Sequence, residues 1–147
     1  MKITQTELPG LLLIEPDVFR DERGYFCETY NQGKLSQLGF NQTFVQDNES
    51  MSSKGVLRGI HFQKPPFAQA KLVRAQQGKV LDVVVDIRKD SKTFGKYFSI
   101  ELSDENKLSG LLYFSLKLNK LTLEEIEKTY AENYNTVLTL NKLDKIN

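Results

Sequence analysis

Several features that mark common classes of protein are scarce in this 147-residue chain. It has one cysteine, one histidine and no tryptophan, and its longest apolar runs, such as Leu11 to Ile14, are four residues long. The single cysteine, Cys27, excludes an intramolecular disulfide framework and predicts a cytoplasmic location. No segment approaches the roughly 18–20 apolar residues of a membrane-spanning helix, and the N-terminus lacks the apolar core of a signal peptide, so no membrane association is expected.

Charge and metal-ligand chemistry are also limited. Twenty Lys and Arg residues against nineteen Asp and Glu residues give a net charge of +1, whereas a nucleic-acid-binding protein normally carries a stronger basic footprint. One histidine and one cysteine cannot supply the three or four ligands of a typical zinc site. We therefore expect neither a nucleic-acid partner nor a metal.

What the chain does contain, over residues 1–105, is a series of short β-rich segments separated by turns. The predicted strands are Leu11–Ile14, Tyr25–Tyr30, Thr43–Gln46, Val56–Gln63 and Tyr97–Leu102. Lys71–Ala75 and Val80–Ile87 flank a turn at Gln76–Lys79 and are predicted to form a hairpin. Short strands with frequent turns favour an antiparallel sandwich or barrel.

The composition changes after about residue 106. The last proline is Pro66 and the last glycine is Gly110. Thr122 followed by Glu125 has the pattern of a capping box, which predicts an amphipathic helix over about 122–133. We therefore divide the chain into a β domain, 1–107, and a divergent C-terminal segment, 108–147.

The residues best suited to chemistry lie between positions 58 and 71. An imidazole, here His61, is the side chain best able to move a proton near pH 7. Arg58 and Lys71 can bind phosphate oxygens or stabilise an oxyanion. Spacing alone also allows His61 to be a structural residue with Arg58 and Lys71 solvated, because positions 58 and 61 face opposite sides of a regular strand.

Further polar residues have both functional and structural interpretations. Arg23 and Glu28 form one candidate pair, and Gln46-Asp47-Asn48 could read sugar hydroxyls or a pyrimidine edge, although such a triplet is common in turns. Asp82 and Asp86 could orient a histidine or form ion pairs with Arg74 or Arg88, and the ion-pair interpretation is favoured.

Four longer stretches make the chain similar to a known family. They are Pro16–Phe26, Phe44–Ser50, Gly55–Gln63 (GVLRGIHFQ) and Ala68–Arg88, and the similarity continues through Ser91, Thr93–Gly95, Glu101–Ser103 and Glu105–Lys107. Together they resemble the dTDP-4-dehydrorhamnose 3,5-epimerase family, a branch of the cupins. The resemblance covers about residues 1–107 in order.

The resemblance implies a fold, an assembly and an activity. It implies a cupin-type jelly-roll β-sandwich that forms a homodimer by exchanging N-terminal strands. Such enzymes epimerise C3 and C5 of a dTDP-4-keto-6-deoxyhexose through an enolate, without a cofactor. By the same resemblance, His61 is the general base and Lys71 stabilises the enolate. The residues implied to bind the sugar nucleotide are Arg23, Glu28, Gln46, Asp47, Asn48, Arg58 and Lys71.

After Lys107 the sequence departs from the family. The family's Pro-x-Gly-Phe-Ala-His strand pair, its general-acid tyrosine and the acidic residue that orients the catalytic histidine have no match in residues 108–147. The sequence therefore predicts a cupin-type jelly roll followed by a C-terminal helix. Whether the jelly roll has all its strands or lacks the later ones is left open by the sequence. The alternative functions are a catalytically impaired or non-catalytic dTDP-sugar-binding cupin, or a truncated product.

Overall fold

The computed structural model describes residues 1–64 and 66–112, and this part of the chain is mainly β, as predicted. Its elements, in chain order, are β1 (Lys2–Gln5), β2 (Leu11–Glu15), β3 (Val18–Asp21), β4 (Gly24–Cys27), α1 (Gln32–Gln37), β5 (Lys71–Arg74), β6 (Lys79–Val85), β7 (Tyr97–Ser103) and β8 (Ser109–Leu112). The predicted helix at 122–133 lies outside the described residues.

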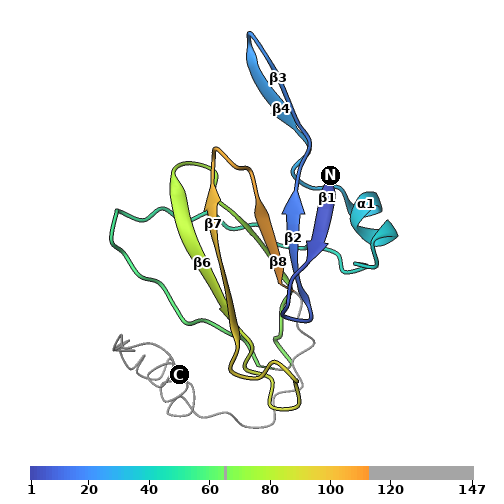
Figure 1. Cartoon of the computed structure of the whole chain (residues 1–147), viewed down its shortest axis with the longest axis vertical. Helices are drawn as coiled ribbons and strands as arrows, with labels where there is room; N and C mark the ends of the chain where they lie inside the picture. The colour runs from blue at the N-terminus through green and yellow to red at the C-terminus, as the bar shows by residue number, and fades with distance from the viewer. Residues whose placement is uncertain (65, 113–147) are drawn as a thin grey trace.

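Two antiparallel sheets form the body of the molecule (Figure 1). The larger sheet has the strand order β1-β2-β8-β5, and the smaller sheet consists of β6 and β7. Strand β8 begins two residues after the boundary predicted at Lys107, yet it lies between β2 and β5. It therefore joins β5 to the sheet that holds the N-terminal strands.

One face of the larger sheet packs against α1. Leu12, Leu72 and Leu111 are cross-strand neighbours on that face. Leu111 belongs to a buried cluster with Leu35 and with Ile14 and Phe40. Helix α1 is only six residues long, so its stability comes from this packing and from Asn31, whose side-chain oxygen accepts a hydrogen bond from the Lys34 backbone N–H.

The opposite face of the larger sheet is turned toward β6 and β7. Because side chains alternate along a strand, Lys71 and Val73 lie on the face of β5 opposite to Leu72, and Gly110 is the β8 neighbour of Val73. A Cβ placed on Gly110 would lie 3.5 Å from an Asp82 carboxylate oxygen of β6. The two sheets therefore face each other across this side, which we call the inter-sheet space.

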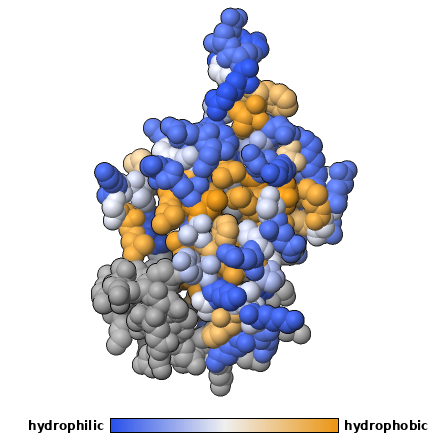
Figure 2. Space-filling model, in the orientation of Figure 1, coloured by the Kyte–Doolittle hydropathy of each residue, from blue (hydrophilic) through white to orange (hydrophobic). Residues whose placement is uncertain are grey.

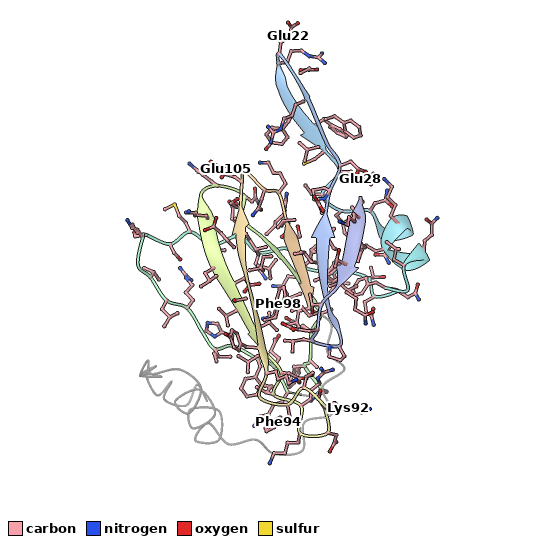
Figure 3. The ribbon with its side chains drawn as sticks, viewed as in Figure 1. Glu22, Glu28, Lys92, Phe94, Phe98 and Glu105 are labelled. Carbon is pink, nitrogen blue, oxygen red and sulfur yellow. The ribbon has the colours of Figure 1, made fainter. Side chains whose placement is uncertain are left out.

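The smaller sheet turns an apolar face toward the same space. Asp82 pairs across the ladder with Ile100, and the flanking pairs on its face are Val80 with Leu102 and Val84 with Phe98. Figure 3 labels Phe98 on this ladder, and Figure 2 shows hydrophobic residues gathered over the middle of the body. Asp82 is the only charged member of this six-residue face.

The hairpin of β3 and β4 stands away from the body (Figure 1). Phe19 and Phe26 are ladder partners whose ring centroids lie 6.5 Å apart, and they are 64% and 69% exposed. An isolated two-stranded hairpin is marginally stable in water. Its exposed aromatic pair is therefore a surface that a partner could cover.

Three predictions of local structure are wrong. Lys71–Ala75 contains β5 and Val80–Ile87 overlaps β6, but these strands pair with β8 and β7 instead of with each other. Thr43–Gln46 and Val56–Gln63 have no regular secondary structure. In the second segment, Ile60 and Phe62 pack against Ile87 instead of joining a ladder.

Candidate functional site

Lys71 lies at the start of β5 on the face turned to the inter-sheet space. Its ladder partner is Leu112, and its side chain is exposed. Among residues 1–64 and 66–112, no carboxylate forms an ion pair with it. The ammonium is therefore available to a ligand that enters this side of the sheet.

Asp82 is the acidic group that the smaller sheet turns toward the inter-sheet space, where its carboxylate lies next to Gly110. Burial raises the pKa of its carboxyl group, and a hydrogen bond from the Val83 backbone only partly offsets this effect. In the part of the chain that the structure describes, no lysine or arginine forms an ion pair with Asp82. The predicted pairing with Arg74 or Arg88 is thus not formed there.

Asp86, four residues further along the chain, is the opposite case. Its carboxylate is fully buried and accepts hydrogen bonds from Arg88, Ser91 and Thr93 at 2.6–2.8 Å. Burial alone would raise the pKa of Asp86, but these donors outweigh it and hold the pKa well below its ordinary value. The predicted ion pair between Asp86 and Arg88 is confirmed.

His61 lies in the irregular segment that precedes β5. Its neighbours Ile60 and Phe62 are partly buried and pack against Ile87 together with Val85, so the backbone on both sides of the imidazole is held near the end of β6. The imidazole itself is exposed, and no side chain among the described residues hydrogen-bonds to it.

Arg23 and Glu28 lie at opposite ends of the β3–β4 hairpin. Figure 3 shows Glu22, the neighbour of Arg23, at the far tip and Glu28 at the base. Arg23 donates to Asp21 at 2.5 Å. The Glu28 carboxylate forms an ion pair with Lys34 at 2.6 Å and accepts a hydrogen bond from Asn31, and both interactions lower its pKa.

The remaining candidates also have local partners. The Gln46 side-chain amide donates to the Asn48 side chain at 3.1 Å, and Asp47 is exposed between them. The Arg58 guanidinium donates to the Ser52 hydroxyl at 2.8 Å and to the Met51 carbonyl at 2.9 Å. Of the eight residues named as catalytic or sugar-nucleotide-binding candidates, the structure joins only Gln46 and Asn48 by a direct hydrogen bond within its described part.

A pocket that the sequence did not indicate lies at the base of the hairpin. It has a volume of about 300 Å³ and is lined by Tyr25, Phe26, Cys27, Thr29, Arg74, Ala75, Gln76 and Lys107. The Lys107 ammonium donates to the Tyr25 hydroxyl at 2.7 Å. Arg74 and Lys107 are 33 positions apart in the chain, so only the folded structure brings these two cations to one pocket.

Within the described residues, no three His, Cys, Asp or Glu side chains gather as a metal site. No helix there is long and apolar enough to cross a bilayer.

Comparison with known proteins assigns the chain to a family. The family model for dTDP-4-dehydrorhamnose 3,5-epimerase matches residues 5–116. A dTDP-4-dehydrorhamnose 3,5-epimerase from Shigella flexneri is 55% identical over 108 residues, which is 73% of this chain and 60% of that protein. The chain thus spans about 60% of the length of this relative and of a second one, 55% identical, from Salmonella typhimurium.

Solved structures agree with the sequence comparison. The crystal structure of the dTDP-4-dehydrorhamnose 3,5-epimerase from Elizabethkingia anophelis NUHP1 superposes with a TM-score of 0.72 at 55% identity, over 77% of this chain and 62% of that one. A dTDP-6-deoxy-D-glucose-3,5-epimerase from Legionella pneumophila, solved in complex with dTDP-4-keto-L-rhamnose, gives 0.72 at 45% identity, over 76% and 59%. These matches confirm the predicted cupin-type β-sandwich, and the chain belongs to the dTDP-4-dehydrorhamnose 3,5-epimerase family.

Proposed function

We propose that this chain catalyses the epimerisation of a dTDP-4-keto-6-deoxyhexose at C3, C5 or both, in the biosynthesis of dTDP-L-rhamnose or a related deoxysugar. The observation that carries the proposal is the family match over residues 5–116, which includes His61 and Lys71. The Legionella pneumophila relative holds a dTDP-4-keto sugar, which supports the same substrate class here.

The proposed chemistry needs a base and a stabilised enolate. The C3 and C5 hydrogens are acidic because each carbon is next to the C4 ketone. His61 takes one of these protons, the C–H bond electrons move to the C4 oxygen, and the Lys71 ammonium stabilises the resulting enolate. Water supplies a proton to the other face of the carbon and inverts it, and His61 then gives its own proton to the resulting hydroxide. No electrons are gained or lost overall, so the reaction needs neither an oxidant nor a reductant.

Nucleotide binding is proposed for the polar residues outside this centre. Arg23 and Arg58 are exposed guanidiniums that can bind diphosphate oxygens bidentately. Glu28, Gln46, Asp47 and Asn48 supply amide and carboxylate groups for the sugar and the thymine edge. A ligand that engages Arg58 would replace its present partners, Ser52 and Met51.

Solvent-proton exchange tests the proposal directly. The chain is incubated with dTDP-4-keto-6-deoxyglucose in D₂O, and the C3 and C5 proton signals are followed by NMR. We expect both or one of these signals to disappear in the wild type, and the rate to fall about 10²–10⁴-fold in His61→Asn.

The matched control is Asp90→Asn, an exposed aspartate in the loop between β6 and β7. It should exchange at the wild-type rate. Folding is checked by a cooperative thermal melt, and dTDP binding by calorimetry. A folded wild type that binds dTDP but exchanges no carbon-bound proton is a non-catalytic dTDP-sugar-binding cupin, and this outcome rejects the enzymatic proposal.

We further propose a homodimer in a reducing cytoplasm, where Cys27 stays a free thiol. The exposed Phe19 and Phe26 of the projecting hairpin support the dimer, because a second copy would cover them. Phe19→Ser combined with Phe26→Ser should shift the mass measured by light scattering from dimer to monomer. Phe94→Ser is the control, since Phe94 lies at the other end of the molecule (Figure 3). A double variant that stays dimeric contradicts this assembly.

A further inference from the structure

Asp82 is a carboxylate in a position that is unfavourable for a charge. Its neighbours on the inner face of β6 and β7 are the apolar side chains of Val80, Val84, Phe98, Ile100 and Leu102. No arginine or lysine of the described residues pairs with it. A half-buried carboxylate with a raised pKa and no cation is typical of a functional position.

Within the described residues, Asp82 has fewer hydrogen-bond donors than the structural carboxylate of Asp86. Structural carboxylates are saturated with donors, as Asp86 is by Arg88, Ser91 and Thr93. The carboxylate of Asp82 instead lies over Gly110, where the absence of a side chain leaves 3.5 Å between the Asp82 Oδ2 atom and the position of a Cβ. Gly110 thus leaves room for the carboxylate but gives it no side-chain partner.

The surroundings of Asp82 are accessible from solvent. Val80, two residues before it on the same face of β6, is 49% exposed, and Val73, opposite Gly110 on β5, is 38% exposed. Lys71 lies two residues from Val73 on the same face of β5. Lys71 and Asp82 therefore lie on the facing sides of the two sheets, with Gly110 next to both Val73 and the Asp82 carboxylate.

We propose that Asp82 binds the hexose of a dTDP-sugar, with its carboxylate accepting a hydrogen bond from a ring hydroxyl while Lys71 faces the sugar from the other sheet. This inference rests on the proposed function and adds a residue that the sequence resemblance did not assign. A carboxylate is an acceptor only, so it matches a hydroxyl donor and would repel the diphosphate. Asp82 therefore distinguishes the sugar end of the ligand from the nucleotide end.

The contribution of the hexose to binding is given by the difference between the affinities for dTDP-quinovose and for dTDP. Quinovose carries a hydroxyl at C4 instead of a ketone, so it cannot form the enolate and binding is measured without turnover. The affinities of the full chain for both compounds are determined by calorimetry. We expect the wild type to bind dTDP-quinovose more tightly than dTDP, and Asp82→Asn to lose about tenfold of that preference.

Matched variants separate the sugar contact from folding. Asp82→Asn should keep its affinity for dTDP within about twofold and melt cooperatively, because the amide has nearly the shape of the carboxylate. Asp90→Asn, an exposed change of the same chemistry, should keep both affinities. Asp82→Glu, which moves the carboxylate by one methylene, should recover part of the preference for the sugar.

Three outcomes overturn the inference, and they are distinguishable. If Asp82→Asn keeps the full preference for dTDP-quinovose, Asp82 does not bind the hexose. If Asp82→Asn lowers the affinities for dTDP and for dTDP-quinovose equally, Asp82 has a structural role and does not contact the hexose. If the wild type binds neither compound, the proposed function fails as well, and this is seen before any variant is made.

Discussion

Asp82 and Asp86 are four residues apart in the chain, and their environments are opposite. Asp86 is fully buried and saturated with donors, so its pKa is held well below the ordinary value. Asp82 is half-buried among apolar side chains, so its pKa is raised. Burial is common to both, and hydrogen bonding decides the sign of the shift. Asp86 is therefore held by side-chain donors from its own loop, whereas Asp82 accepts from the Val83 backbone.

The largest effect is expected for Asp86→Ala. The substitution leaves Arg88, Ser91 and Thr93 without their acceptor and leaves a guanidinium that is only 20% exposed without its carboxylate. We expect the free energy of unfolding to fall by about 3–5 kcal/mol. Urea unfolding followed by circular dichroism measures it, and a loss below about 1 kcal/mol would remove Asp86 as the structural member of the pair.

Asp82→Asn should have no such cost. The Asp82 carboxylate is half-buried and has no cation partner among the described residues, so replacing it with a neutral amide removes the free-energy cost of desolvating its charge. The free energy of unfolding at pH 7 should therefore equal that of the wild type or exceed it by up to about 1 kcal/mol. The same urea titration applies. A decrease of more than about 1 kcal/mol would show that Asp82 is also structural and that the contrast with Asp86 is false.

The two aspartates should also give opposite dependences of stability on pH. Asp86 has a lowered pKa in the folded chain, so its contribution is present above the ordinary value of 3.8 and is lost as the pH falls below it toward the folded pKa. Asp82 has a raised pKa, so its contribution is present below 3.8 and is lost as the pH rises through the folded pKa.

Unfolding titrations between about pH 2 and pH 7 on the wild type and the two Asn variants test these signs. The advantage of Asp82→Asn over the wild type should grow as the pH rises from about 3. The deficit of Asp86→Asn should shrink as the pH falls below 3.8. Curves that shift in the same direction for both variants would contradict the assignment.

The smallest effect on stability is expected at Arg23. Its ion pair with Asp21 is exposed on both sides, and such pairs contribute little. Arg23→Ala should therefore leave the melting temperature unchanged within error while weakening dTDP binding in calorimetry. A clear loss of stability with unchanged binding would make Arg23 a structural residue.

Local sequence patterns predicted individual strands better than their partners. The apolar run Leu11–Ile14 lies within β2, and Tyr97–Leu102 forms all but the last residue of β7. The turn at Gln76–Lys79 indicated a hairpin, but β5 pairs with β8, and the paired residues are 35–41 positions apart in the chain. The partner of a strand depends on such distant residues, and a local pattern does not contain them.

Similar limits apply to the site. Arg88, Ser91 and Thr93 follow Asp86 closely in the sequence, so its saturation could be anticipated from nearby residues. The burial of Asp82 depends on Ile100 across the ladder and on Gly110 in the opposite sheet. The roles proposed for His61 and Lys71 come from the family resemblance, and they stay predictions until they are measured.

The most direct measurement is deuterium incorporation into dTDP-4-keto-6-deoxyglucose by the wild type and His61→Asn, followed by mass spectrometry. The proposed chemistry predicts a gain of one or two mass units with the wild type and almost none with the variant, when both melt cooperatively and bind dTDP. Equal incorporation by the two proteins, or none by a wild type that binds dTDP, would contradict an enolate formed by His61.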